Sequence, residues 1–384
     1  GSGAGMKTTR ALGAGIAGAL CSVATAADSF DQQVESLVRP LANSLADIVF
    51  YKVDLFGQAF PLIVLWLALA ALFFTVYLGF INIRGFGLAL RHVRGHYHDP
   101  AANGEISHFQ AVATAVSGTV GIGNIGGVAV AIAIGGPGAA LWLLVAGFLS
   151  MSTKLVECTL GVKYRRYNSD GSVSGGPMYY LEHYLARRGA PGWGRLLGGF
   201  YALSLVIGCL GIGNMFQSNQ AYVQFVTITG GEQSFFAERG WLFGLLIAAT
   251  VAVVIIGGIR SIARVAAHIV PFMGILYVLC ALVIIGMSAE QLPAAIALIL
   301  DSAFEADSVT GGMVGAIIVG FQRALFSNEA GIGSASIAHS AVQTDEPASE
   351  GLVSLLEPFI DTVVICTLSS LVIVTTAYPA GLMD

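Results

Sequence analysis

Long apolar runs separated by short polar stretches dominate the sequence from residue 60 onward. A run of about 20 apolar residues is long enough to cross the hydrocarbon core of a bilayer as a helix. The pattern predicts eight membrane spans, at residues 60–80, 109–134, 138–162, 198–227, 241–257, 266–287, 312–340 and 351–377. We therefore expect an all-α polytopic membrane protein, in contact with the lipid bilayer along most of its length.

A different pattern precedes residue 60. Residues 1–5 look like a tag or a misannotated start. From Met6 the chain has a basic beginning, a short apolar stretch and the small residues Ala24-Thr25-Ala26, which is the order of a cleavable signal peptide at residues 6–26. Between residues 28 and 59, apolar positions recur at helical spacing among polar ones, and this predicts an amphipathic helix at the periplasmic membrane surface.

The composition supports the membrane class and excludes others. Hydrophobic residues make up 55% of the chain and charged residues 11%, whereas soluble proteins carry about 25% charged residues. With a net charge of -5 and no basic stripe, we expect no nucleic-acid partner. The five cysteines lie far apart and form neither a disulfide framework nor a metal motif, so buried inert thiols are expected.

Basic residues are concentrated in alternate loops. They are Arg84, Arg91 and Arg94, then Lys163, Arg165, Arg166, Arg187, Arg188 and Arg195, and finally Arg260 and Arg264. The positive-inside rule places these loops in the cytoplasm and the mature N-terminus in the periplasm. The signal peptide predicts the same side, so we expect a multi-pass protein of the bacterial inner membrane.

The stretch SGTVGIGNIGGV, at residues 117–128, contains the spacing G-x-G-x-x-G. In a dinucleotide-binding loop this motif follows a strand, opens a helix and has an acidic residue about twenty positions later. Here the flanks are apolar and Leu144 stands where that acid belongs. The context therefore argues against a nucleotide-binding loop.

Two membrane interpretations of this stretch remain open. The glycines can mark a break in the helix, which lipid tolerates only where the freed backbone groups face an ion, a ligand or water. Alternatively, they can let two helices pack closely, since Gly123 and Gly127 form G-x-x-x-G. Close packing does not explain Ser117, Thr119 and Asn124.

A second copy favours the helix break. Span 312–340 contains FSNEAGIGSASIAHS, where Gly331-Ile332-Gly333-Ser334 repeats Gly121-Ile122-Gly123-Asn124. Span 312–340 is the fifth span after span 109–134. Successive spans cross the membrane in alternating directions, so two spans an odd number apart run in opposite directions. Glycine-interrupted spans at corresponding positions of two oppositely oriented halves are the sequence sign of an inverted-repeat transporter.

Four motifs carry a resemblance to a known family. They are SGTVGIGNIGGVAVAIAIGGPGA, KYRRYNSDGSVSGGPMYYLE, GIGNMFQSNQ and FQRALFSNEAGIGSASIAHSA. Between Pro61 and Thr376 the chain resembles the alanine or glycine:cation symporters, also called sodium:alanine symporters. The resemblance implies a non-enzymatic, sodium-coupled importer of a small neutral amino acid, alanine or glycine, that works by alternating access and has no cofactor beyond co-transported Na+.

The resemblance also implies a leucine-transporter-type fold, an inverted-repeat bundle with discontinuous helices. In that fold, residues 60–80 form an extra N-terminal span, residues 109–287 the first five-helix repeat, and residues 312–377 the first two helices of a second repeat. Family members have further core helices. We therefore expect the second repeat to be truncated at residue 384.

Site residues follow from the two predicted breaks and from the resemblance. The expected substrate-binding residues are Gly118, Thr119, Gly121, Gly123, Asn124, Asn214, Gln217, Asn328, Gly331, Gly333 and Ser334. Thr119, Asn124 and Glu329 are expected to couple the ion, with Na+ held by backbone carbonyls near Gly118 and Gly121.

Several of these residues have structural alternatives. Asn124 can cap a half-helix, Asn214 and Gln217 can hydrogen-bond between helices, and Glu329 can pair with Arg323. Farther along, Glu357 is interpreted as interfacial and Asp361 has no obvious partner.

Two other functions compete with transport. A membrane receptor or non-transporting scaffold of the same fold would bind the amino acid without moving it. Ser336 and His339, three positions apart, could belong to an intramembrane hydrolase, but the sequence shows neither a third orienting group nor the G-x-S-x-G elbow.

Overall fold

The computed structural model describes residues 36, 39–40, 43–55, 58–97, 99–305 and 312–382. The predicted signal peptide and the first five residues lie outside this part. The chain divides into one unit that ends at Ile63 and another that begins at Val64. In the first unit, residues 43–49 are helical, and β1 (Lys52–Leu55) pairs antiparallel with β2 (Gln58–Pro61).

The strand pair corrects part of the predicted amphipathic helix over residues 28–59. Polar and apolar residues alternate at Lys52, Val53 and Asp54, and a period of two suits an extended strand better than a helix. The register joins Lys52 to Pro61 and Val53 to Phe60. The helical part that the structure describes ends before this pair.

The rest of the described chain is mainly helical, with one more short strand pair, β3 (Arg166–Tyr167) and β4 (Val173–Ser174). Its helices are α2 (Leu62–Tyr77), α3 (Ile81–Arg84), α4 (Phe86–Val93), α5 (His108–Thr119), η1 (Ile122–Asn124), α6 (Gly126–Gly135), α7 (Ala139–Lys163), α8 (Pro177–Arg187), α9 (Pro191–Gly208), η2 (Cys209–Phe216), α10 (Gln217–Ile228), η3 (Gly231–Gln233), α11 (Gly240–Ile255), α12 (Gly258–Met287), α13 (Leu292–Phe304), α14 (Gly312–Asn328), α15 (Ser334–Ser340), α16 (Pro347–Ser354), α17 (Leu356–Pro358), η4 (Phe359–Cys366) and α18 (Thr367–Thr375).

Helices occupy all eight predicted spans, and an all-α membrane protein is confirmed at this level. Four continuous helices are long and apolar enough to cross a membrane, namely Ala139–Lys163, Pro191–Ile228, Gly258–Met287 and Pro347–Thr375. The pair α5 and α6 meets the same criteria with a bend of 66°. The helices α2 and α11 have 16 residues each and are shorter than the predicted spans.

One helix of 13 residues, α13, lies where the sequence predicted a loop between spans six and seven. Its apolar run is too short for a span, so hydropathy alone missed it. Ala295 and Ile299 of α13 pack into the same core cluster as Ala139 and Leu143 of α7.

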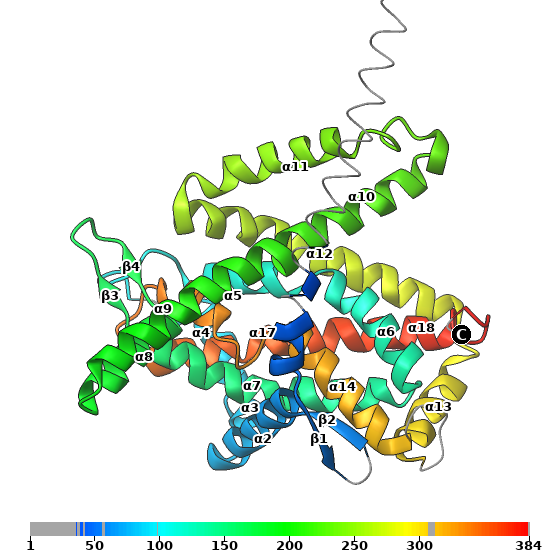
Figure 1. Ribbon diagram of the computed structural model, residues 1–384, viewed down its shortest axis with the longest axis horizontal. Helices are drawn as coiled ribbons and strands as arrows, with labels where there is room; N and C mark the ends of the chain where they lie inside the picture. The colour runs from blue at the N-terminus through cyan, green and yellow to red at the C-terminus, as the bar shows by residue number, and fades with distance from the viewer. Residues whose placement is uncertain are drawn as a thin grey trace, which may run out of the picture. The chain divides into compact units, whose positions relative to one another are not determined.

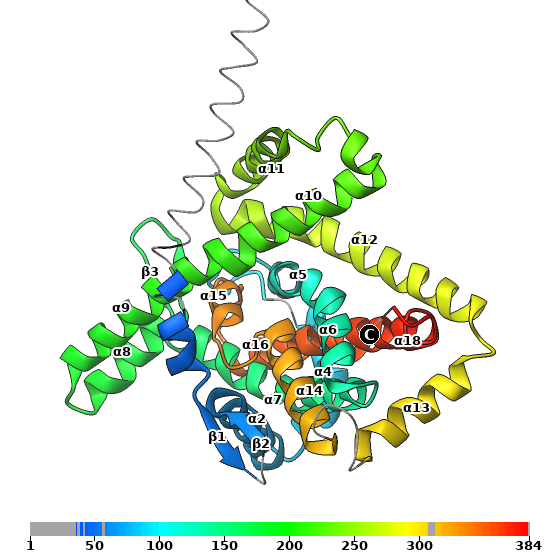
Figure 2. The same ribbon diagram turned by 45° about the vertical axis from the view of Figure 1, so that its right-hand side comes forward.

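The helix α7 runs through the centre of the second unit. In Figures 1 and 2 it lies beside α14 and beside the segment α16 to η4. Glycines permit this close approach: a Cβ on Gly351 would lie 1.9 Å from Thr159 Oγ1, and one on Gly147 would lie 2.4 Å from Thr362 Cγ2. The helices α6, α14 and α15, which flank the two breaks described below, also contact α7.

The helices α9 to α11 are exposed along most of their length. Cys209 and Cys280, on η2 and α12, are exposed, whereas Cys158 and Cys366 are buried as expected. The expectation of buried thiols is therefore wrong for Cys209 and Cys280.

Candidate functional site

The first helix break lies between α5 and α6, within the glycine segment. The helix α5 ends at Thr119, so Gly118 and Thr119 are still helical, and the backbone leaves the helix at Val120 and Gly121. The Asn124 side-chain carbonyl accepts the Gly121 N–H at 2.8 Å, and Gln217 Oε1 accepts the Ile122 N–H at 3.3 Å. Side chains thus satisfy the backbone donors that the break frees.

Asn124 also joins this break to two other segments. Its amide nitrogen donates to Asp361 Oδ1 at 2.8 Å and lies 3.1 Å from Ser327 Oγ. Ser327 and Thr362 both donate to Asp361 Oδ2, at 2.9 and 2.7 Å. Asn124, Ser327 and Asp361 are all buried, at 1%, 4% and 0% exposure. We call these four residues, Asn124, Ser327, Asp361 and Thr362, the junction cluster.

The second break separates α14 from α15, where the sequence predicted it. Glu329, Gly331 and Gly333 have φ values of 54°, 89° and 91°, which lie in the left-handed region. A Cβ on Gly333 would lie 2.3 Å from Pro177 Cγ, and one on Gly331 2.6 Å from Leu67 Cδ2. Both conformation and packing therefore require glycine at these two positions.

The predicted site residues around this break contact one another and the protein. Asn328 is fully buried, donates to Thr362 Oγ1 at 3.0 Å and accepts the Ala330 N–H at 3.0 Å. Ser334 donates to the Glu329 carboxylate. The Gly331 N–H donates to Glu157 Oε2 at 2.8 Å, so that N–H faces a protein carboxylate in this conformation.

A cavity of about 390 Å³ lies between the two breaks. Its lining includes the predicted site residues Gly118, Thr119, Gly123, Gln217 and Glu329, together with Ser327 of the junction cluster and Arg323. The volume falls within the range of about 300–1,000 Å³ that is usual for small-molecule sites. The cavity brings together both breaks and α10.

Arg323 and Glu329 give this cavity one cationic and one anionic side chain. They form no ion pair within 4.0 Å in the part of the chain that the structure describes, and Glu329 is held by Ser334 instead. The interpretation of Arg323 as the partner of Glu329 is therefore wrong. Opposite charges on one cavity wall match the two charged ends of a zwitterion.

A second cavity of about 390 Å³ opens on the other side of the first break. Gly121, Asn124 and Gln217 line it, opposite Tyr277 of α12. Gln217 thus borders both cavities. Asn214 is exposed on η2 and lines neither of them.

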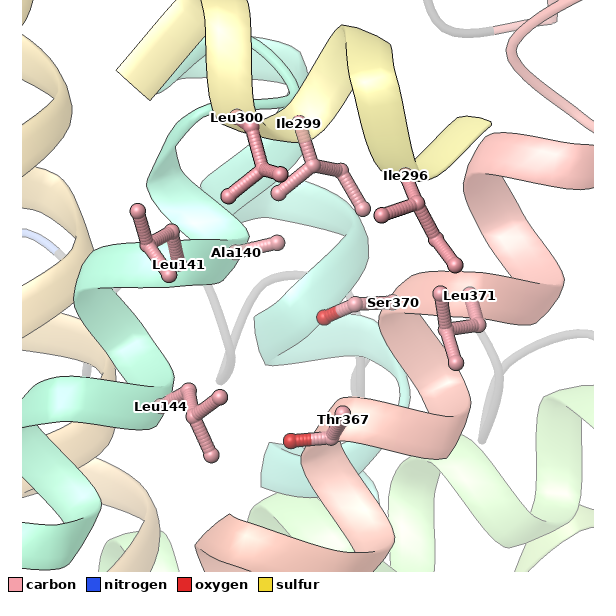
Figure 3. Close-up of a pocket in the computed structure, with 9 residues that line it drawn as sticks. All are labelled: Ala140, Leu141, Leu144, Ile296, Ile299, Leu300, Thr367, Ser370 and Leu371. Carbon is pink, nitrogen blue, oxygen red and sulfur yellow. The ribbon is translucent and has the colours of Figure 1, made fainter. Parts of the chain in front are cut away.

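A smaller pocket of about 250 Å³ lies between α7, α13 and α18, as Figure 3 shows. Aliphatic side chains surround it, and its polar atoms are the hydroxyls of Thr367 and Ser370. No charged side chain lines it, so it cannot compensate the ends of an amino acid.

The structure corrects two sequence interpretations in α17 and η4. Glu357 is not interfacial: it is fully buried and accepts a hydrogen bond from Lys154 Nζ at 2.8 Å. Asp361 is not without partners, because it belongs to the junction cluster. Spacing along one helix did not indicate that Lys154 contacts Glu357 or that Asn124 contacts Asp361, since these partners are 203 and 237 positions apart in sequence.

Ser336 and His339 do not form a nucleophile and base. Ser336 Oγ donates to the Gly333 carbonyl at 2.7 Å. His339 contacts Glu350 through Nδ1, and its Nε2 faces Glu357 at 3.7 Å. Neither nitrogen is directed at the serine hydroxyl, so this pair does not support hydrolysis.

No cluster of three or more His, Cys, Asp or Glu side chains arranged to hold a metal occurs among the described residues. Na+ does not require such a cluster, because transporters bind it with carbonyl and other oxygen atoms at broken helices. The junction cluster supplies one carboxylate and two hydroxyls as oxygen groups, and the Asn124 amide nitrogen donates to the carboxylate.

Comparison with known proteins relates this chain to a family of transporters. Residues 43–383 match the model of the sodium:alanine symporter family. The chain is 40% identical over 329 residues to the sodium/alanine symporter AgcS of Methanococcus maripaludis, covering 84% of this chain and 70% of that protein. It is also 36% identical over 313 residues to the probable sodium/glutamine symporter GlnT of Bacillus subtilis, covering 81% of this chain and 62% of that protein.

A third relative is the amino-acid carrier protein AlsT of Bacillus subtilis, 36% identical over 303 residues, with 79% of this chain and 61% of that protein covered. The match spans most of the described chain, including both breaks and the junction cluster. The apolar helices agree with a multi-pass membrane protein. The chain belongs to the sodium:alanine symporter family.

Proposed function

We propose that this protein is a sodium-coupled symporter that moves a small neutral amino acid, alanine or glycine, into the cell by alternating access. The competing receptor function requires only binding. Family membership and the names of the relatives support coupling to sodium and an amino-acid substrate. The junction cluster indicates which residues would bind Na+, and the cavity indicates which residues would bind the amino acid.

The junction cluster is the proposed Na+ site, because it contains the buried carboxylate of Asp361. Asp361 is fully buried, and no Lys, Arg or His forms an ion pair with it in the described part of the chain. A buried carboxylate without a cationic partner is unfavourable unless it is neutralised. A bound Na+ neutralises it, and the hydroxyls of Ser327 and Thr362 add oxygen atoms.

This proposed ion site includes Asp361, Ser327 and Thr362, which were not among the site residues expected from sequence. Asn124 stays an ion-coupling residue, now because its amide nitrogen donates to the Asp361 carboxylate while its amide oxygen accepts the Gly121 N–H. Thr119 lines the substrate cavity, and its hydroxyl faces the carbonyls of its own helix. Na+ near the Gly118 and Gly121 carbonyls stays a proposal.

The cavity between the breaks is the proposed substrate site. Arg323 faces the substrate carboxylate and Glu329 its ammonium group, because opposite charges in a low-dielectric cavity attract strongly. Gly118, Gly123, Gly126 and Gly127 line one wall and leave little side-chain volume, as a small substrate requires. Gln217 closes the wall toward the first break.

We further propose the leucine-transporter-type arrangement, with inverted repeats beginning at α5 and at α14. Two broken helices that meet at one buried cluster support it. The cytoplasmic placement of the basic loops, a periplasmic mature N-terminus and an inner-membrane location stay proposals that rest on the positive-inside pattern.

Uptake of radiolabelled alanine into vesicles tests the function. An inward Na+ gradient is expected to drive alanine above its external concentration, and replacing Na+ with K+ is expected to abolish accumulation. A receptor would bind at most a stoichiometric amount of alanine in either salt. Stoichiometric binding without accumulation would therefore contradict the proposal.

A further inference from the structure

A surface of strong positive charge lies at the turn between α8 and α9, outside the proposed transport sites. Arg187 ends α8, Arg188 follows it, and Arg195 lies near the start of α9. All three side chains are exposed. We call these three residues the basic turn.

The basic turn forms no ion pair in the part of the chain that the structure describes. No Asp or Glu occurs at residues 183–231, and the preceding acid, Glu182, already pairs with Arg166 at 2.9 Å. By contrast, Arg260 of another predicted cytoplasmic loop pairs with Glu105 at 3.1 Å. The guanidinium groups of the basic turn are therefore available to an anionic partner.

Exposed aromatic side chains accompany these arginines. Trp193 is 63% exposed and Tyr184 is 52% exposed. The Arg188 guanidinium lies 5.4 Å from the centre of the Tyr184 ring. A guanidinium stacked on a ring keeps its N–H groups for an anion, and Trp and Tyr are enriched where a bilayer meets water. This combination of side chains suits the headgroup level of a membrane.

The length of the following helix places the basic turn at that level. The continuous helix Pro191–Ile228 has 38 residues, which is about 57 Å at 1.5 Å per residue. The hydrocarbon core is about 30 Å thick, so even a tilted helix of this length extends among the headgroups. Leu196 and Phe200, which follow the basic turn, are 60% and 68% exposed and match the hydrocarbon.

The other end of α8 contacts the second break. A Cβ on Gly333 would lie 2.3 Å from Cγ of Pro177, the first residue of α8, and one on Gly176 would lie 2.6 Å from Ile337 of α15. The helix α8 also packs closely on α9, because a Cβ on Gly198 would lie 2.8 Å from the α8 backbone. Figures 1 and 2 show α8 and α9 side by side. Thus α8 connects the basic turn to the second break.

An anionic phospholipid fits this surface better than a soluble anion does. Its phosphate accepts hydrogen bonds from guanidinium groups, and its acyl chains can lie along the exposed apolar side chains of α9. A soluble anion would leave Trp193 and Leu196 without an apolar partner. In addition, the positive-inside pattern places the basic turn at the cytoplasmic leaflet, where anionic lipids are concentrated.

We propose that the basic turn binds the headgroup of an anionic phospholipid, and that this contact holds α8 against the second break. The lipid site is separate from the proposed Na+ and amino-acid sites, whereas its effect on transport rests on the proposed function. A bound headgroup compensates the three like charges and fixes this end of α8 at the membrane surface. Pro177 then keeps its place against Gly333.

Quenching of Trp193 fluorescence tests the binding step without any substrate. The protein is placed in phosphatidylcholine vesicles that contain a minor fraction of phosphatidylglycerol, and one of the two lipids carries bromine on its acyl chains. The signal lost in Trp193→Phe reports Trp193. Per mole, brominated phosphatidylglycerol should quench Trp193 at least about twofold more than brominated phosphatidylcholine, because surface arginines concentrate anionic lipid. Trp66 of α2, which is 69% exposed, should show no preference.

Two triple variants separate the basic turn from general positive charge. The first should abolish the lipid preference of Trp193, and it combines Arg187→Gln, Arg188→Gln and Arg195→Gln. The second should keep the preference, and it removes three exposed arginines after the first span by Arg84→Gln, Arg91→Gln and Arg94→Gln. Exposed substitutions of this kind change folding stability little. Equal quenching by the two lipids in the unchanged protein, or equal loss of the preference in both variants, would overturn the proposal.

Alanine uptake tests the connection with the second break. Na+-driven uptake by the unchanged protein and by the second variant should be about fivefold or more higher with phosphatidylglycerol present than in phosphatidylcholine alone. The variant of the basic turn should show the same low uptake in both vesicles. A response to phosphatidylglycerol that this variant retains in full would overturn the connection.

The outcomes separate this inference from the proposed function. Equal Na+-driven uptake by the unchanged protein in both vesicles would overturn the link between lipid and transport and leave the proposed function intact. Absence of Na+-driven uptake in every vesicle would contradict the proposed function, while the quenching of Trp193 would still decide whether the basic turn binds anionic lipid.

Discussion

The side-chain amide of Asn124 donates to the carboxylate of Asp361 at 2.8 Å, across 237 positions of sequence. The same side chain accepts the N–H of Gly121, two residues after the end of α5. One residue thus connects the proposed ion-binding carboxylate to the backbone of the first break. Occupancy of the junction cluster can therefore change the geometry of the substrate cavity through a single side chain.

Removing that connection is expected to uncouple the two sites. In Asn124→Ala, the carboxylate and the backbone carbonyl of Asp361 each lose a hydrogen bond and Gly121 loses its acceptor. Na+-driven alanine uptake should therefore fall about tenfold or more, with the protein still in the membrane. Vesicle uptake normalised to protein content measures it. Asn168→Ala, in the exposed turn between β3 and β4, is the control. Normal transport by Asn124→Ala would show that the first break is not coupled to the ion.

Substitution by alanine is expected to be more harmful at Gly333, in the second break, than at Gly123, in the first break. Gly333→Ala combines an unfavourable φ of 91° with a clash 2.3 Å from Pro177, so it should reduce both folded yield and uptake. Gly123 has ordinary backbone angles, and its Cβ would lie 3.8 Å from Ser327 Cα, so Gly123→Ala should fold normally. Melting temperatures in detergent compare the two variants. Equal melting temperatures would contradict the described geometry of the second break.

Lys154 is expected to be essential for stability. Lys154→Met leaves Glu157 and Glu357 buried without their cation and should destabilise the protein by about 3–5 kcal/mol. Lys163→Met, an exposed position on the same helix, should change little. The double variant Lys154→Met with Glu357→Gln should regain part of the loss, because it removes one of the two uncompensated charges. Thermal unfolding in detergent measures all three, and a neutral Lys154→Met would contradict the buried ion pairs.

Arg165 holds the segment after α15 in place. Its guanidinium donates to four backbone carbonyls, those of Asn103, Ser340, Val342 and Thr344, at 2.6 to 2.9 Å. Arg165→Lys cannot reproduce this planar fork and should destabilise the protein by about 2 kcal/mol or more. Arg166→Lys, whose partner Glu182 is part-exposed, should have little effect. Equal unfolding temperatures for the two variants would refute the role of Arg165.

Sequence patterns predicted the elements whose signal is local. Apolar runs located the spans, and the repeated G-I-G-x motif located both helix breaks, because hydropathy and glycine content act within a few residues. The strands β1 and β2 and the helix α13 were missed, since each is shorter than a span. Inverted symmetry and the leucine-transporter-type fold stay predictions.

The junction cluster and the buried ion pair between Lys154 and Glu357 could not be predicted in this way. Asp361 and Glu357 look like isolated acids near a helix end until Asn124 and Lys154 are brought against them by packing around α7. Arg165 was counted with the cytoplasmic basic residues, although it is buried against four carbonyls. In the sequence, these residues stand out only as acidic and basic residues within apolar segments. That placement marks them as functional candidates, but it does not indicate which residues they contact.

Asp361 tests the central claim most directly, through the Na+ dependence of alanine uptake in vesicles. If Na+ neutralises the buried Asp361 carboxylate, Asp361→Asn should raise the Na+ concentration for half-maximal uptake by about tenfold or more, or abolish Na+ dependence, because the neutral amide no longer attracts the ion. Asp170→Asn, at a fully exposed position in the β3–β4 turn, should leave the Na+ titration unchanged. A Na+ titration of Asp361→Asn that coincides with that of the unchanged protein would contradict the assignment of the junction cluster as the sodium site.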